Sequence, residues 1–375
     1  MKKFLIGTMA VAALASCSQD ELVQSNDKEI SYSVAANKGS RAEDIFCNNN
    51  LPASFRVWAK TADGTNYILG DEIKKTADGW VDQVATRYWP AAALDFFAEV
   101  NAGDAFNWNG GSPTIDNFTV PTDVTAQKDL LYSVVAGATK GTNNTVAFNF
   151  RHALSQVVFK AVNKNAKLHI IIDGVTVGNL TATNTFTYPT VTTDDNYINH
   201  DGTNTDALPM QGTWAAIAAP GNTDYAVSFA PVTLTSTVQD LTTSTADGVA
   251  GASTAMMLLP QTTTAWDVTP GNYLPAGDAA QTGTYFLVKC KIYNIAGDVY
   301  TEGDVQLYDG YAAIPVAIDW KQGYKYTYTF IFDKGNGGLE PDPTDPTPVL
   351  DIMKFTVSVD DFADGGNTDI DMNQE

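Results

Sequence analysis

The chain has 375 residues, and 44% of them are hydrophobic, which is the share of a folded globular protein with room for two domains. It carries 22 basic and 43 acidic residues, for a formal net charge of −21. This charge repels nucleic-acid phosphates, so we expect no nucleic acid among its partners. No apolar run after the N-terminal one approaches the ~20 residues that a membrane helix needs.

Residues 1–16 have the pattern of a secretory signal peptide that is removed from the mature protein. Two lysines precede the apolar run Phe4–Leu14, and small residues follow at the cleavage position. The sequence Leu14-Ala15-Ser16-Cys17 resembles a bacterial lipobox, in which the cysteine is acylated and becomes the new N-terminus. We therefore predict lipidation of Cys17 and an outer-membrane lipid anchor that holds the protein at the cell surface before further processing.

Residues 17–41 form a leader that contains one strand pattern and ends at an arginine. Ile30, Tyr32 and Val34 alternate with serines, so one face of the predicted strand is apolar. Arg41 and Ala42 follow in a small, polar stretch of the kind that proteases cut. Cleavage there would separate this strand from the first domain.

Short strand patterns fill residues 42–334, and no long segment has the helical period, although Asp71–Thr76 and Thr125–Leu130 could each form one helical turn. Many short strands with turn residues between them are typical of β-sandwiches, and the length implies two. A turn-rich segment at 140–144 predicts the boundary between an N-terminal sandwich, 42–142, and a C-terminal one, 143–334. The predicted strands are Ser54–Lys60, Ala93–Val100, Leu130–Ala136, Val146–Phe150, Gln156–Val162, Leu168–Val175, Tyr225–Phe229, Ala255–Leu259, Tyr285–Tyr293 and Tyr324–Phe332.

The C-terminal part begins with a linker, residues 335–349, whose prolines and glycines predict an extended, semi-rigid segment. Residues 350–375 hold one more strand pattern and an acidic tail. In this strand Phe355, Val357 and Val359 share an apolar face. Because a lone strand cannot bury such a face by itself, it must return to its own domain or dock in another molecule.

Residue patterns for catalysis or metal binding are not found, so we expect no enzymatic activity, no cofactor and no metal site. His152 and His169 lie in strand patterns and His200 in a polar loop, without the spacing of metal ligands. Beyond Cys17, the chain holds Cys47 and Cys290, which either form a disulfide or leave Cys290 as a buried thiol in a strand.

Several motifs, in their order along the chain, resemble those of the fimbrillins, the pilins of Bacteroidales type V fimbriae. This resemblance implies an all-β chain of two transthyretin-like β-sandwich domains in tandem, with a tethered C-terminal strand. It also implies export as a lipoprotein and cleavage by an arginine-specific protease, for which Arg41 is the matching position. The motifs are the lipobox, Ile30–Val34, Arg41-Ala42, Phe55–Ala59, Tyr88–Pro90, Leu94–Ala98, Phe148–Ser155, Leu258–Gln261, Trp320–Tyr328 and Val359–Gly366.

The resemblance further implies that cleavage releases the strand of Ile30, Tyr32 and Val34. The strand of Phe355, Val357 and Val359 from a neighbouring subunit would then take its place. The linker is longer and richer in proline than the common pattern.

These observations favour a structural pilin subunit that polymerises by strand exchange, with other pilin subunits as its partners. The alternative is a monomeric surface lipoprotein or tip adhesin that binds glycans, host proteins or bacterial surface ligands and keeps its C-terminal strand folded back on itself. Stalk, tip and anchor positions in a fimbria all remain open at this point.

Overall fold

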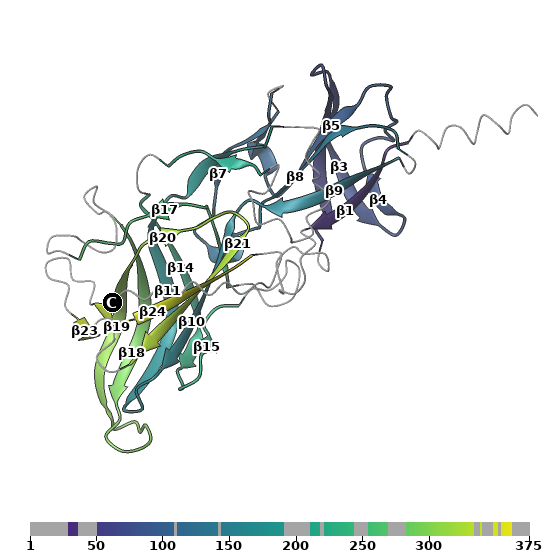
Figure 1. The fold of residues 1–375 in the computed structure, drawn as a ribbon. Coiled ribbons are helices and arrows are strands. Elements are labelled where there is room, and N and C mark those ends of the chain that lie inside the picture. Colours follow the sequence, from purple (N-terminus) through teal and green to yellow (C-terminus); the bar gives the residue numbers. More distant parts are fainter. Residues whose placement is uncertain are drawn as a thin grey trace, which may run out of the picture.

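The computed structural model describes residues 29–36, 51–108, 111–141, 144–190, 211–217, 221–243, 254–268, 283–333, 338–339, 348–351 and 354–361. These residues form an elongated molecule with a barrel at one end and a two-layered sandwich at the other (Figure 1). The described part is built almost entirely of strands, which confirms the all-β class. Within the described ranges, no helix has the length and apolar character needed to cross a membrane.

Seven strands of the N-terminal part close into a barrel. Closure joins the two edges of the sheet, so each of these described strands has a neighbour on both sides. The interior is filled by aromatic rings. The ring centroid of Phe55, for example, lies 5.2 Å from those of both Phe148 and Phe150. In barrel order, the strands are β1 (Ser31–Ala36), β4 (Gly79–Asp82), β3 (Asn66–Thr76), β2 (Ser54–Thr61), β5 (Leu94–Val100), β8 (Leu131–Ala138) and β9 (Thr145–His152).

The structure places the boundary between the two parts later than the predicted residue 142. β9 belongs to the barrel because it pairs with β8 on one side and with β1 on the other. The turn-rich segment 140–144 therefore lies within the connection between two paired strands, and the chain leaves the barrel after His152. Turn residues mark hairpins as well as domain boundaries, which is why the sequence placed the boundary too early.

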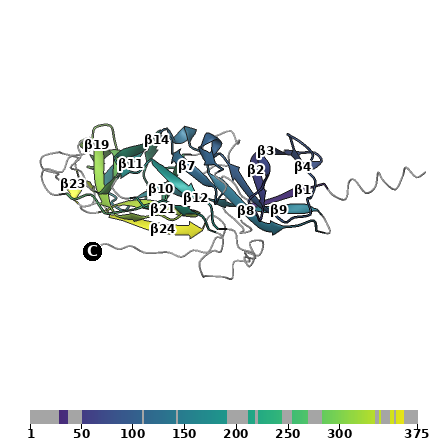
Figure 2. The ribbon, with the colours of Figure 1, turned by 90° about the horizontal axis from the view of Figure 1, so that it is seen from above.

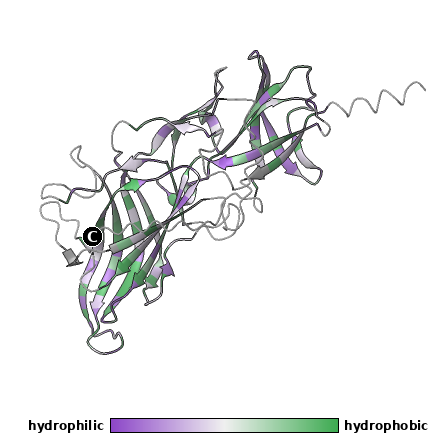
Figure 3. Ribbon diagram, in the orientation of Figure 1, coloured by the Kyte–Doolittle hydropathy of each residue, from purple (hydrophilic) through white to green (hydrophobic). Residues whose placement is uncertain are grey.

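The C-terminal sandwich has two sheets with an aromatic core between them. The ring centroid of Phe286 on one sheet lies 4.8 Å from that of Tyr328 and 5.5 Å from that of Phe159, both on the other sheet. Figure 2 shows the layers from above, and Figure 3 shows hydrophobic residues concentrated along these strands. One sheet runs β15 (Gln239–Asp240), β10 (Ser155–Asn163), β21 (Tyr324–Phe332) and β24 (Lys354–Asp361), with β16 (Met256–Leu258) also paired to β10. The other runs β14 (Thr223–Thr233), β11 (Leu168–Leu180), β18 (Thr284–Asn294), β19 (Val305–Val316), β22 (Gly338–Leu339) and β23 (Pro348–Asp351).

A smaller sheet ties the two parts together. Its strands come from both predicted domains, because β7 pairs with β12 across the boundary. The buried apolar residues of barrel, small sheet and sandwich form one continuous cluster. The order of this sheet is β13 (Thr213–Trp214), β12 (Thr183–Thr187), β7 (Thr114–Thr119) and β6 (Phe106–Asn107). The remaining elements are the β17–β20 pair (Thr262–Thr263, Ile318–Asp319) and two 3₁₀ turns, η1 (Gly103–Ala105) and η2 (Val124–Ala126).

The two helical turns that the sequence allowed have different outcomes. Asp71–Thr76 lies within β3, so a helical turn there is wrong. Thr125–Leu130 overlaps a 3₁₀ turn, η2, whose N-terminus is capped by Asp123 through its hydrogen bond from Thr125 N. The linker, where it is described, forms the short strands β22 and β23 at one side of β19.

Candidate strand-exchange site

β1 occupies the position that closes the barrel, between β9 and β4, and we call this position the β1 site. It runs parallel to β9 over its whole length, from Ser31 opposite Thr145 to Ala36 opposite Phe150. On its other side Tyr32 lies opposite Trp80 of the antiparallel β4. The first strand of the described chain is thus held by its backbone on both edges.

The inner face of β1 is apolar, as the alternation in the sequence predicts. Ile30 is 5% exposed and Tyr32 is 7% exposed, whereas Val34 is partly buried against the same core. The Tyr32 ring stacks on Phe148 of β9, with ring centroids 6.2 Å apart. β1 therefore supplies side chains that cover the aromatic rings of the barrel interior.

The outer face of β1 is polar and makes local hydrogen bonds. Ser31 Oγ lies 2.7 Å from Thr145 Oγ1 of β9, and both residues are exposed. Ile30 N donates to Arg87 O at 2.8 Å. The start of β1 is therefore fixed at the end of the barrel where β9 also begins.

Charged groups surround the hydroxyl of Tyr32 at this end of the barrel. Arg87 Nε donates to Asp71 Oδ2 at 2.7 Å. Burial raises the pKa of Asp82, and the neighbouring Asp71 carboxylate raises it further. Burial also raises the pKa of Tyr32, with the carboxylates of Asp82 and Asp71 adding to the effect. The Tyr32 hydroxyl is thus neutral and desolvated. It lies near the side chains of Asp82 and Asp71, and Arg87 donates a hydrogen bond to Asp71.

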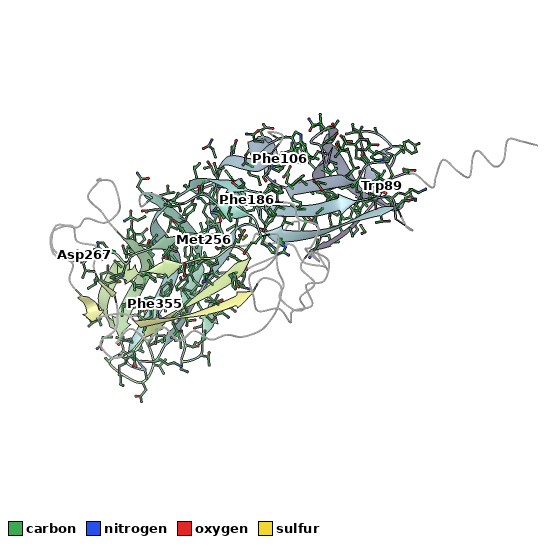
Figure 4. All side chains as sticks on the ribbon, turned by 45° about the horizontal axis from the view of Figure 1, so that its top comes forward. Trp89, Phe106, Phe186, Met256, Asp267 and Phe355 are labelled. Carbon is green, nitrogen blue, oxygen red and sulfur yellow. The ribbon has the colours of Figure 1, made fainter. Side chains whose placement is uncertain are left out.

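The second candidate strand, β24, lies on its own C-terminal sheet. It pairs antiparallel with β21 from Lys354 to Asp361, and β21 is its one neighbour among the described strands. Val357 is 6% exposed, but Phe355 and Val359 remain half-buried. Phe355 lies 6.1 Å from the ring of Phe286, and Figure 4 shows it in the sandwich, far from the end of the barrel marked by Trp89. Of the two alternatives left open by the sequence, this structure has the strand in its own domain.

The structure separates the other predicted site residues into two groups. Cys17, Arg41 and Ala42 lie outside the described residues, as do Cys47 and His200. Cys290 is a buried free thiol in β18, and burial raises its pKa to about 12. Within the described part of the chain, no group of three or more His, Cys, Asp or Glu side chains could hold a metal ion.

A buried pair that the sequence did not reveal lies at the end of the barrel from which the chain continues into the sandwich. His152 Nδ1 donates to Asp129 Oδ2 at 2.5 Å, and both side chains are almost fully buried. The next residue, Ala153, accepts from Trp214 Nε1 at 2.7 Å. The sequence placed His152 in a strand pattern, but it did not indicate the partner, because Asp129 lies in a polar segment with no recognisable motif.

A polar cavity of about 220 Å³ lies beside the end of β11. Its polar groups are tied to backbone: Asn179 Nδ2 donates to Gly283 O at 2.8 Å, and Gln261 Oε1 accepts from Thr181 N at 2.9 Å. The described residues that line it carry hydroxyl and amide groups and no ionisable side chain. Such a lining can hydrogen-bond a neutral ligand and holds no acid or base.

Comparisons with known proteins point to one family. The fimbrillin-like family matches residues 40–344. Similar solved structures include candidate cell adhesion proteins from Bacteroides uniformis (15% identity, 89% of this chain and 98% of that chain covered, TM-score 0.42) and Bacteroides ovatus (13%, 89% and 98%, TM-score 0.45). A third comes from Parabacteroides distasonis (11%, 90% and 97%, TM-score 0.45). The comparison with curated proteins gives no match.

Proposed function

Because the chain belongs to the fimbrillin-like family, we propose that it is a structural pilin subunit of a type V fimbria that supports adhesion at the cell surface. As a member of this family it is structural and not an enzyme. In the proposed pathway it is exported as a lipoprotein through Cys17, and an arginine-specific protease cuts it between Arg41 and Ala42. Strand exchange with other pilin subunits then builds the polymer.

One observation carries this proposal: β1 is the strand that closes the barrel, and it precedes Arg41 in the chain. Its loss would uncover Phe148 and leave the edges of β9 and β4 without a partner. Each large apolar side chain exposed in this way is worth about 1.5–3 kcal/mol. The opened barrel would therefore have a strong tendency to bind a strand with an apolar face.

β24 has the properties of a strand that can be given away. In its own sheet it has one neighbouring strand, and Phe355 and Val359 stay half-buried. In the β1 site, a strand has neighbours on both edges and its inner face is covered. Transfer from the sheet edge to the β1 site of another subunit therefore gains hydrogen bonds and buried apolar area. Such a head-to-tail contact repeats without closing and produces a filament.

The test of this proposal is controlled proteolysis of the full-length chain. Treatment with an arginine-specific protease should yield a chain that starts at Ala42 and an SDS-resistant ladder of multimers. The Arg41→Ala chain should stay intact and monomeric under the same treatment. A protein that is cut at Arg41 and remains monomeric would contradict polymerisation by strand exchange.

The lipoprotein step has its own test. The Cys17→Ser chain should lose palmitate labelling and should no longer fractionate with outer membranes, because the acyl chains are its proposed anchor. A Cys17→Ser protein that still floats with outer membranes would contradict lipid anchoring. A matched control is Cys290→Ser, since that thiol is buried and should have no role in anchoring.

A second candidate function is a monomeric surface adhesin or fimbrial tip subunit. The burial of Val357 on its own sheet favours it, because a strand already paired over its length has no need of a partner. The polar cavity near Asn179 would suit a neutral glycan. A mature chain that stays monomeric in sedimentation and binds glycans on an array would support this function over the first.

A further inference from the structure

The polar cavity beside the end of β11 has walls that depend on three unusual backbone positions. Asn179 has a φ of +63°, and Gly283 has a φ of +99°. A Cβ at Gly283 would collide with Ala265 O, and a Cβ at Gly221 would collide with the backbone of Leu180. These chain segments can approach one another only because the two glycines lack side chains. The backbone therefore fixes the shape of the cavity.

A β-bulge places Asn179 in the lining of this cavity. The register between β11 and β14 shifts between Val177 and Leu180. Asn179 N donates to Asp224 Oδ1 at 3.1 Å, and the side-chain amide donates to Gly283 O. The residue is 2% exposed, and its Oδ1 accepts no hydrogen bond from the described residues. Bulges often re-aim one side chain beside a binding site, so Asn179 can offer a buried acceptor to a ligand.

Threonine hydroxyls in the lining are available as well. Gln261 holds Thr181 through the backbone N and O of Thr181, and Thr264 O accepts from Thr284 N at 2.8 Å. The hydroxyls of Thr181 and Thr264 make no hydrogen bond within the part of the chain that the structure describes. Thr263 Oγ1 and Thr284 Oγ1 lie 2.6 Å apart. Because a free hydroxyl can both donate and accept, the cavity presents both kinds of group to a ligand.

Resting on the adhesion proposed above, we infer that this cavity binds one neutral sugar residue. One sugar hydroxyl donates to Asn179 Oδ1, and others pair with the hydroxyls of Thr181 and Thr264. Ile217 supplies an apolar wall against which the C–H groups of a pyranose ring pack. A ligand site commonly combines apolar walls with a few convergent polar groups, and a sugar ring carries both kinds of surface.

Size and charge define the class of sugar. The cavity of about 220 Å³ is smaller than the ~300 Å³ at which pockets for drug-sized ligands begin, so it suits a single ring. Two carboxylates adjoin the lining: Asp224 accepts from Asn179 N, and Asp319 Oδ1 accepts from Thr262 Oγ1 at 2.8 Å. Together with the net charge of −21, they disfavour anionic sugars. The site therefore selects neutral pyranoses over uronic and sialic acids.

The position of the cavity leaves it open in a polymer. Its lining comes from the end of β11, the start of β18 and β17, and β17 lies midway along the molecule in Figure 1. β1 pairs with β4 and β9, and β24 pairs with β21, so the proposed exchange involves none of the lining residues. Every copy in a fimbria would present one sugar site. Many weak sites on one filament bind a glycan-covered surface far more tightly than one site does.

Sugar binding to the uncleaved Arg41→Ala chain tests the site without polymerisation. The probes are methyl glycosides of glucose, galactose, mannose, fucose and N-acetylglucosamine, with methyl glucuronide as the anionic control, followed by saturation-transfer NMR. At least one neutral glycoside should bind, and Thr181→Val and Thr264→Val should each weaken its binding about three- to tenfold, the effect of one hydrogen bond. Valine keeps the branched shape of threonine, so both variants should fold. Thr213→Val, at an exposed position of β13, is the matched control and should leave binding unchanged.

The outcomes separate this inference from the function on which it rests. Weaker binding in either cavity variant, with binding by the Thr213→Val chain unchanged, supports the sugar site. No binding of any neutral glycoside, equal binding in all variants, or tighter binding of the glucuronide overturns it, whether or not the cleaved chain polymerises. A chain that binds sugar as expected but forms no multimers after cleavage at Arg41 contradicts strand exchange and leaves the sugar site standing.

Discussion

At the scale of single residues, Trp58 shows how the outer wall of the barrel is fixed. Its ring stacks on Phe106 at 3.7 Å, and the Arg56 guanidinium lies 5.2 Å from its centroid. The ring also lies against Gly70, where a Cβ would be 3.1 Å from the Trp58 ring. Gly70 also has a φ of +86°, a conformation that side chains disfavour.

The Gly70→Ala change should therefore destabilise the protein by about 1–3 kcal/mol, through backbone strain and displacement of the Trp58 ring. Gly64→Ala is the matched control, because Gly64 has a φ of +87° and an added Cβ would meet nothing within 4 Å. Thermal unfolding and tryptophan fluorescence measure the two effects. Equal losses of stability and unchanged fluorescence in both variants would show that the Trp58 contact has no weight.

The raised pKa of Asp82 predicts that the stability of the barrel depends on pH. Its pKa is raised by burial, so the native state binds the proton more tightly than the unfolded chain. The stability from this group is complete below the ordinary aspartate pKa of 3.8 and is lost as the pH rises through the raised value. Asp82→Asn keeps a side-chain oxygen as acceptor for Val84 N and removes the buried charge.

We expect Asp82→Asn to raise the Tm at neutral pH by a few degrees and to leave it nearly unchanged at about pH 3. The difference in Tm between the two proteins should grow across the mildly acidic range. Asp78→Asn, on a turn where the residue is exposed, serves as the control for a lost surface charge. A constant Tm difference at all pH values would contradict a raised pKa at Asp82.

At the scale of elements, the local content of aromatic and β-branched residues decided which strands could be predicted. The strands at Ser54–Thr61 and Leu94–Val100 were predicted almost to the residue, because they are rich in aromatic and β-branched residues. β3 was missed because Asp71 and Glu72 interrupt its apolar pattern, and β19 because it contains Gly310 and Pro315. Asp71 pairs with Arg87, a partner from outside the strand that no local pattern announces.

A substitution at Val357 tests both the pairing of β24 in its own sheet and its proposed transfer to another subunit. Val357→Asp places a carboxylate at a position that is 6% exposed in the sheet and faces inward in the proposed β1 site. Desolvation of an unpaired carboxylate is worth several kcal/mol, so the variant should detach β24 in the monomer and abolish the multimer ladder. Hydrogen exchange of β24 and SDS gels measure the two results.

Thr356→Asp carries the same charge one residue away, on the opposite face of the strand, and should keep most of the ladder. If both variants assemble like the original protein, β24 is not the exchanged strand. If both variants fail to assemble to the same extent, a charge on either face of β24 prevents assembly, and the inner face has no special role.

At the scale of the whole molecule, barrel and sandwich are joined by shared structure. β7 and β12 pair across the boundary, and the Asp129–His152 pair lies buried where the barrel ends. Asn101 Nδ2 also donates to the backbone carbonyl of Asp129 at 2.8 Å. We therefore expect the two parts to unfold together, although the sequence suggested two separate domains.

Asp129→Ala should destabilise the whole protein by about 3 kcal/mol, because it removes the buried carboxylate to which His152 donates. The surface pair Asp173–Lys289, with a separation of 3.2 Å, provides the control; Asp173→Ala should change stability by less than about 1 kcal/mol. Circular dichroism and fluorescence should report one shared transition in all three proteins. Two separate transitions in Asp129→Ala would mean that this pair alone couples barrel and sandwich.

The sequence alone predicts the all-β class, the apolar faces of the first and last strands, and the order of motifs that indicates a fimbrillin. These features are local, because alternation and turn residues act over a few neighbouring positions. The tertiary structure decided that the first strand closes a barrel, that β9 belongs to that barrel, and that β24 pairs with β21. Strand partners and buried pairs such as Asp129–His152 join residues that are distant in the chain, so their energies depend on packing that no short segment contains.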